Sequence, residues 1–241
     1  MRKPAAVFAT PPEPVLLQAV VFDMDGVIVD SHPAHRVAWK TFLRALGRET
    51  NDAELDFVMD GRKREEILVH YLGPLTREQL EEYGRLKNDL FWQAAAEVVP
   101  IPGAFEFIDR LRGAGIVAAV ATSASASRAV STLRRLGLLS HFEAVVTGEE
   151  VPKGKPDAGI YQLACQRLQC SPKAAVAVED AASGVRAAKS AGLKCVGIAW
   201  HQSGDSLTAA GADAVLHNFV DLTLSDFASL VGIPQSGRSE T

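Results

Sequence analysis

Cysteine is scarce in this sequence of 241 residues, which has three: Cys165, Cys170 and Cys195. The number is odd and no two of them form a CxxC pair, so the pattern does not indicate a disulfide framework. Small apolar thiols packed inside a protein of a reducing compartment fit it better. We therefore expect a cytoplasmic protein.

Long apolar runs are missing too, and none approaches the roughly 20 residues that cross a bilayer. Residues 1–10 are basic at the start, but Pro4 interrupts them and their apolar stretch is too short for a signal peptide. Positive charge is not in excess either, because the formal net charge is −4. Broad binding to nucleic acid or anionic membranes usually needs a basic face. We expect a monomer that binds a small molecule, with neither nucleic acid nor a membrane as its partner.

Nucleotide-binding motifs are also lacking. No GxGxxG follows any predicted strand, so a dinucleotide site has no support. The segment from Gly148 to Lys155 resembles a P-loop only faintly. It is one residue too long, and Pro156 stands where Ser or Thr is required.

What is present is a regular alternation of strand and helix. The apolar run at residues 15–22 predicts a buried parallel strand. Further strands are expected at residues 117–121, 144–147, 174–178, 195–198 and 214–216, and helices at 104–113, 127–136, 158–169, 184–191 and 224–230. Repeated strand–helix units predict a parallel, Rossmann-like α/β sheet covered by helices on both faces.

Between the first strand and the rest, helical periodicity replaces this alternation. Helices are expected before Gly47 and at residues 65–71 and 77–96, with no clear strand from 32 to 98. A stretch of that length is too long for a loop, so we predict an inserted, all-helical cap domain. The predicted boundaries are a loose arm at 1–14, a core at 15–31 and 99–234, the cap at 32–98 and a polar tail at 235–241. The crossings near 31–34 and 98–102 are the expected hinges.

Polar residues that carry chemistry follow the predicted strands, and ligands of an open parallel sheet collect at that edge. They are Asp23 and Asp25 after the first strand, Thr122 and Ser123 after the second, Lys155 after the third, and Glu179 and Asp180 after the fourth. Grouped carboxylates need a cation, and hard oxygen ligands select Mg²⁺. A hydroxyl and an ammonium bind phosphate oxygens, while one carboxylate can attack phosphorus and another can handle a proton.

Each residue also has an interpretation without catalysis. Asp23-Met24-Asp25-Gly26 alone could form an Asx turn, but it is not a DxDxDG calcium loop because Gly26 directly follows Asp25. Thr122 alone could cap a helix, Lys155 could be a solvated surface residue, and Glu179-Asp180 could cap the next helix. Their joint position at successive strand ends favours a phosphoryl-transfer site.

These motifs, in this order, resemble those of the haloacid dehalogenase superfamily over residues 18 to 232. The matching residues are Asp23-Met24-Asp25-Gly26-Val27, Thr122, Lys155-Pro156 and Glu179-Asp180. The resemblance implies that Asp23 is the nucleophile, Asp25 the general acid and base, and Thr122 and Lys155 further catalytic residues. It also implies Mg²⁺ held by Asp23, the Asp25 carbonyl and Asp180, with Glu179 beside or among these ligands. The second Asp argues against a true dehalogenase.

The helical insertion resembles the cap of the β-phosphoglucomutase-like subfamily. This implies substrate contacts at His35, Trp39, Arg64, Lys87 and Asn88, and Ser123 of the core is a further expected substrate contact. Without the resemblance, Trp39 could be cap core, Lys87 could extend to solvent and Arg64 could be one more surface charge. The run Thr122-Ser123-Ala124-Ser125 departs from the Ser-x-Ser-Lys typical of the mutases and is closer to related phosphatases.

The sequence thus predicts Mg²⁺-dependent hydrolysis of a small sugar phosphate or similar metabolite through an aspartyl-phosphate. The alternative is β-phosphoglucomutase-type isomerisation through a sugar bisphosphate. A third interpretation, a non-enzymatic phospho-acceptor domain, fits less well because such domains are about half this length and lack a cap.

Overall fold

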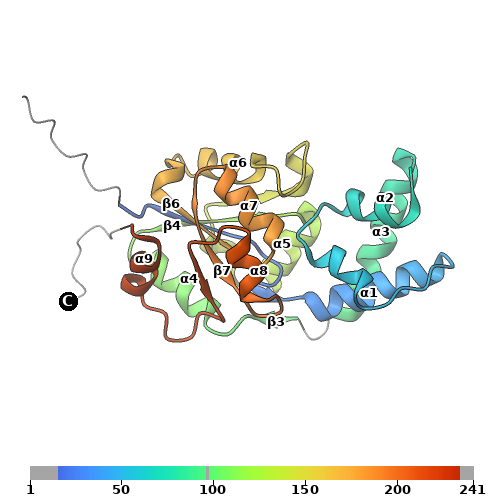
Figure 1. Cartoon of the computed structure of the whole chain (residues 1–241), viewed down its shortest axis with the longest axis horizontal. Helices are drawn as coiled ribbons and strands as arrows, with labels where there is room; N and C mark the ends of the chain where they lie inside the picture. The colour runs from blue at the N-terminus through green and yellow to red at the C-terminus, as the bar shows by residue number, and fades with distance from the viewer. Residues whose placement is uncertain (1–15, 96–97, 234–241) are drawn as a thin grey trace, which may run out of the picture.

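The computed structural model describes residues 16–95 and 98–233, and its centre is a six-stranded sheet (Figure 1). The strands lie in the order β5-β4-β1-β6-β7-β8, and each neighbouring pair is parallel. Their bounds are Ala19–Phe22 for β1, Val117–Thr122 for β4, Ala144–Thr147 for β5, Ala175–Glu179 for β6, Lys194–Ile198 for β7 and Ala214–Leu216 for β8. The predicted parallel α/β fold is confirmed.

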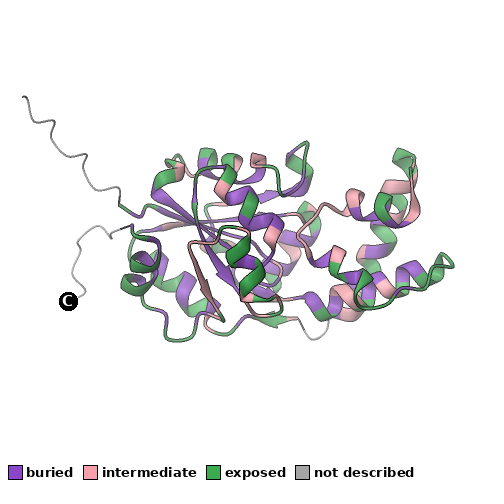
Figure 2. Cartoon of the chain, in the orientation of Figure 1, coloured by how far each residue is buried: buried purple, intermediate pink, exposed green. Residues whose placement is uncertain are grey.

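Helices cover both faces of the sheet because successive strand residues point to opposite sides. Val20 and Phe22 of β1 pack in the apolar cluster that contains α4, α5 and α9, whereas Ala19 and Val21 pack with α6, α7 and α8. These helices are α4 (Ala104–Gly113), α5 (Ala126–Arg135), α6 (Gly159–Arg167), α7 (Ala182–Ser190), α8 (Gly204–Ala209) and α9 (Leu224–Val231). The central strands β4, β1 and β6 are accordingly buried almost throughout, whereas the edge strand β8 is half-buried (Figure 2).

The inserted helices lie beyond one end of the sheet (Figure 1). They are α1 (His32–Ala45), α2 (Arg64–Leu72) and α3 (Arg77–Ala94), with a 3₁₀ turn at Glu54–Met59. Trp39, Phe42 and Leu68 belong to an apolar cluster formed within these helices. The all-helical insertion of the predicted fold class is therefore present, while its division into a domain at residues 32–98 stays a prediction.

Two short strands mark where the chain enters and leaves the insertion. β2 (Val29–Asp30) pairs antiparallel with β3 (Val99–Pro100). The sequence did not predict them, because two residues are too few to show alternation. The six-residue helix α8 was missed because it spans less than two turns, which is too short to show helical periodicity.

Several boundaries differ from those expected. β1 begins at Ala19 rather than at 15, and α1 begins at His32, with Pro33 in its first turn. α3 ends at Ala94. The predicted arm at 1–14, the tail at 235–241 and the predicted helix end at residue 96 lie outside the described residues. Within 16–95 and 98–233, no helix is both long enough and apolar enough to cross a membrane.

Candidate active site

The site begins at the end of the central strand. β1 lies between β4 and β6, and the backbone N–H of Asp23 donates to Val178 of β6 at 2.9 Å. Asp23 is therefore held beside the end of β6, where Glu179 and Asp180 follow. One carboxylate oxygen from each of these three residues lies within 4.8 Å of the others. All three side chains are buried.

Lys155 is the cation inside this acidic cluster. Its Nζ lies 2.5 Å from Asp23 Oδ1 and 2.5 Å from Glu179 Oε1, and the residue is 1% exposed. Burial alone would lower the pKa of Lys155, but the two carboxylates outweigh it and raise that pKa above its ordinary value. The interpretation of Lys155 as a solvated surface residue is wrong.

The three acids carry more negative charge than Lys155 balances. Burial raises the pKa of Asp23 well above its usual range, Glu179 and Asp180 add to the rise, and Lys155 opposes it. Glu179 accepts a hydrogen bond from Tyr161 at 2.5 Å through Oε1, but its buried Oε2 has no hydrogen-bond partner among the described residues. A small, hard cation would satisfy such oxygens, so the cluster fits a divalent metal.

Two glycines leave room for these carboxylates. A Cβ on Gly26 would lie 2.0 Å from Asp180 Oδ2, and one on Gly184 would lie 2.1 Å from the Glu179 carboxylate. Gly26 also has a φ of +78°, in the left-handed region that favours glycine. The chain therefore turns tightly after β1 and packs against Asp180.

Gly26→Ala should destabilise the protein more than Gly47→Ala. Gly47 has nearly the same φ, +77°, but a Cβ added there would have nothing within 4 Å, so only the conformational cost of about 1–2 kcal/mol applies. At position 26 the methyl group would also displace Asp180. Denaturant unfolding of both variants measures the difference in the free energy of unfolding. If both variants lost the same free energy of unfolding, the contact between position 26 and the Asp180 carboxylate would not contribute to stability.

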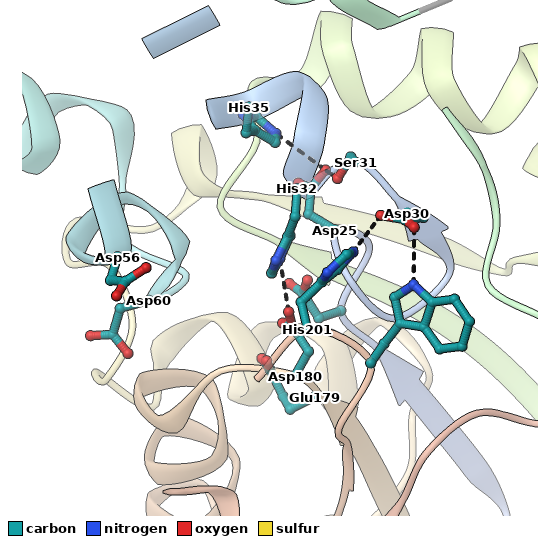
Figure 3. Close-up of polar contacts among 12 residues, drawn as sticks. Asp25, Asp30, Ser31, His32, His35, Asp56, Asp60, Glu179, Asp180 and His201 are labelled. Carbon is teal, nitrogen blue, oxygen red and sulfur yellow. Dashed lines mark hydrogen bonds and ion pairs between the residues drawn. The ribbon is translucent and has the colours of Figure 1, made fainter. Parts of the chain in front are cut away.

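Asp25 is turned toward a different set of partners. Arg128 donates from Nη1 to Oδ1 at 2.8 Å and from Nη2 to Oδ2 at 2.5 Å. Ser31 Oγ donates to Oδ1 at 2.6 Å, and His35 Nε2 lies 3.4 Å from the same oxygen (Figure 3). Burial would raise the pKa of Asp25, but the Arg128 guanidinium outweighs burial and holds it well below the usual range.

The polar groups after β4 lie beside these acids. Thr122 is fully buried, and its Oγ1 accepts from Ala124 N at 3.1 Å. The N-cap of α5 is Ser125, so the interpretation of Thr122 as that cap is wrong. Glu179 and Asp180 do not cap α7 either, because its N-cap is Ala181 and it lacks a side-chain cap bond.

The residues predicted on the helical insertion form the opposite wall. Lys87 Nζ lies 2.8 Å from His35 Nδ1 and 5.2 Å from the ring centroids of both Trp39 and Phe91. Lys87 is 3% exposed, so it does not extend to solvent, and burial lowers its pKa well below the ordinary value. Burial and the Lys87 charge likewise lower the pKa of His35 to about 3.

Between the two walls lies a cavity of about 80 Å³. Ten of the predicted residues line it: Asp23, Asp25, His35, Trp39, Arg64, Lys87, Asn88, Thr122, Ser123 and Asp180. Lys155 and Glu179 are the two that do not, and they lie buried behind Asp23. Trp39 fits both its predicted role as a substrate contact and the alternative of a cap-core residue, since it lines the cavity and also packs in the core of the inserted helices.

Three basic residues of the cavity wall were not among the predicted site residues: His32, Arg62 and Arg128. Arg128 is the most consequential of them, because it contacts Asp25 and lies 5.1 Å over the Phe91 ring. The available signal was its position one turn after the polar end of β4. Its ion pair with Asp25 could not be predicted from the sequence, because the two residues are 103 positions apart.

The loop before α2 rests on the core and closes the cavity. Ser123 Oγ donates to Gly61 O at 2.6 Å, Ser183 N donates to Asp60 Oδ1 at 3.2 Å, and Lys63 Nζ donates to Val151 O at 2.9 Å. This loop therefore contacts the segments that follow β4, β5 and β6. An occupant of the cavity would contact both parts of the chain.

Comparison with known proteins gives consistent matches. Residues 17–192 match the family described as haloacid dehalogenase-like hydrolase. A phosphorylated carbohydrates phosphatase of Thermotoga maritima is 32% identical over 203 residues, covering 83% of this chain and 94% of the relative. The β-phosphoglucomutase of Bacillus subtilis is 32% identical over 217 residues, covering 86% and 92%. The crystal structure of CbbY from Rhodobacter sphaeroides in complex with phosphate has a TM-score of 0.76 at 29% identity, covering 86% and 96%.

Proposed function

The chain belongs to the haloacid dehalogenase-like hydrolase family, and we propose that it hydrolyses a small sugar phosphate or a similar phosphorylated metabolite. It is an enzyme of the phosphatase or phosphomutase type, like the two curated relatives. The interpretation as a non-enzymatic phospho-acceptor domain is wrong. The buried cluster of Asp23, Glu179 and Asp180 around Lys155 is the observation that carries the proposal.

Asp23 is proposed as the nucleophile. Lys155 holds its Oδ1, which leaves Oδ2 to attack phosphorus from the cavity wall. The new bond joins this oxygen to phosphorus, while the bond from phosphorus to the leaving sugar oxygen breaks. Water then attacks the aspartyl-phosphate, releases inorganic phosphate and restores the Asp23 carboxylate.

Asp25 is proposed to handle the protons of both steps. It gives a proton to the departing sugar oxygen and takes one from the attacking water. Without substrate its carboxylate is ionised and held by Arg128 and Ser31, so Asp25 first accepts the proton that a phosphate monoanion brings into the site, and it then gives this proton to the sugar oxygen. Thr122 and Ser123 would hold phosphate oxygens at the end of β4.

Mg²⁺ is the proposed cofactor. Asp23, Asp180 and the backbone carbonyl of Asp25 would hold it, with Glu179 close by. When bound, it would balance the negative charge of the phosphoryl group and of the acids around it. The buried Oε2 of Glu179, which has no hydrogen-bond partner within residues 16–95 and 98–233, supports this assignment.

A panel of sugar phosphates tests the proposal through the release of inorganic phosphate. Each compound would be assayed with and without a sugar bisphosphate, which a mutase needs as a primer. Release that does not depend on the primer is the expected result. Isomerisation of β-glucose 1-phosphate that requires the primer, with little release, would establish a mutase instead.

The mutase alternative keeps one observation in its favour, which is the pair of basic side chains on the far wall of the cavity. Arg64 and Lys87 both line it from the inserted helices. The Arg64 guanidinium packs beside Gly84, and its Nη2 lies 3.1 Å from Glu65 Oε1. A planar guanidinium suits a second phosphate because it donates two hydrogen bonds to it.

Arg64→Ala should therefore lower any mutase turnover at least about tenfold, which corresponds to about 1.4 kcal/mol of transition-state stabilisation. Phosphate release from simple monophosphates should fall much less. Arg85→Ala, at an exposed position of α3, is the matched control and should change neither rate. Equal losses of both activities in the Arg64 variant would mean that Arg64 supports the fold or the shared chemistry.

A further inference from the structure

His32 is a buried histidine that the steps above do not use. It is the first residue of α1, where the chain leaves β2 for the inserted helices, and it is 6% exposed. Its Nε2 lies 2.9 Å from Asp180 Oδ2, and its ring points toward that carboxylate (Figure 3). A ring nitrogen so close to a carboxylate oxygen must carry the proton, because two acceptors would repel each other.

The surroundings fix this ring in place. His32 stacks on His201, with ring centroids 4.9 Å apart and an angle of 21° between the planes. His201 Nε2 in turn lies 2.6 Å from Asp30 Oδ1 (Figure 3), and Trp200 Nε1 donates to Asp30 Oδ2 at 2.9 Å. The loop after β7 thus supports His32 through two aromatic residues.

Gly26 provides further evidence that the backbone accommodates the contact between His32 and Asp180. A Cβ at Gly26 would lie 2.0 Å from Asp180 Oδ2 and 2.8 Å from His32 Nε2. Both side chains therefore converge on the space that glycine leaves open. Asp180 Oδ2 is buried and has no hydrogen-bond partner among the described residues, so the 2.9 Å ion pair with His32 is the contact that orients this carboxylate.

We propose that His32 is a positioning residue for the metal, because it holds the Asp180 carboxylate in the orientation that binds Mg²⁺. Groups that hydrogen-bond to a metal ligand typically contribute about 10- to 100-fold to metal affinity. Since His32 begins α1, the contact also ties the metal site to the point where the inserted helices join the core.

The inference rests on the proposed magnesium site, and calorimetric titration of the metal-free protein with Mg²⁺ tests both separately. His32→Gln places an amide nitrogen near the position of Nε2, so its affinity should stay within about threefold of the unmodified protein. His32→Asn and His32→Leu cannot reach Asp180, so each should bind Mg²⁺ about tenfold more weakly. His70→Gln, at an exposed position of α2, is the control and should not change the affinity.

The outcomes are distinguishable. If the unmodified protein binds no Mg²⁺, the proposed metal site fails. If it binds Mg²⁺ and the Gln and Asn variants bind equally tightly, the positioning role of His32 fails. The comparison of His32→Gln with His32→Asn tests the positioning role even if the His32→Leu variant does not fold. The unfolding temperature gives a second readout that is independent of turnover. It would be measured for each variant in chelator and again with Mg²⁺, and the increase that Mg²⁺ causes reports metal binding.

Discussion

Asp23→Asn is expected to lower turnover at least about a thousandfold while leaving the fold intact, because it removes the attacking oxygen's charge and almost nothing else. The amide has nearly the shape of the carboxylate, so the buried site keeps its packing. Initial rates of phosphate release measure the effect. Asp89→Asn makes the same chemical change at an exposed position of α3 and should leave the rate unchanged.

The stability of the same variant should not fall. Asp23 has a pKa raised by burial, so its ionised form is less favourable in the folded chain than in the unfolded one. In metal-free protein this cost is present when pH lies above the folded pKa and disappears as pH falls below the unfolded pKa. At neutral pH, Asn at position 23 should therefore unfold at the same or a higher denaturant concentration. A folded variant with near-normal rates would exclude Asp23 as the nucleophile.

Removal of the metal is expected to have the second large effect. Excess chelator should abolish phosphate release, and added Mg²⁺ should restore it, because three buried carboxylates and one lysine leave an unbalanced negative charge beside the phosphoryl site. Asp180→Ala should weaken Mg²⁺ binding at least about a hundredfold, since it takes away a ligand rather than a supporting group.

Titration calorimetry with Mg²⁺ would measure that loss directly. Asp109→Ala, at an exposed position on α4, is the control for the loss of one acid and should bind Mg²⁺ normally. Undiminished turnover in chelator, at a concentration that strips Mg²⁺ from the buffer, would rule out the metal-dependent chemistry.

The sequence was informative about the site because strand ends are local features. Asp23, Thr122 and Glu179 each stand at the end of an apolar run, and the parallel order of β4, β1 and β6 brings those ends together. The alternation of strands and helices required such an order. The motif residues could therefore be predicted without knowing a single tertiary contact.

The contacts that orient these residues could not be predicted in this way. Arg128 and His32 act on Asp25 and Asp180 across 103 and 148 residues, and nothing in their local sequence indicates those partners. Lys87 shows the intermediate case. Its place in an apolar helical stripe was visible, but only the packing of α3 against α1 shows that the charge lies between Trp39 and Phe91.

The covalent intermediate is the central claim, and chemical trapping tests it most directly. The enzyme would be mixed with substrate, quenched in acid during turnover and reduced with borohydride, which converts an aspartyl-phosphate to homoserine. Mass spectrometry of the digested protein would then locate the change. The proposed mechanism predicts homoserine at position 23 in the unmodified protein. The same product at another acid, or no acyl phosphate during demonstrable turnover, would contradict it.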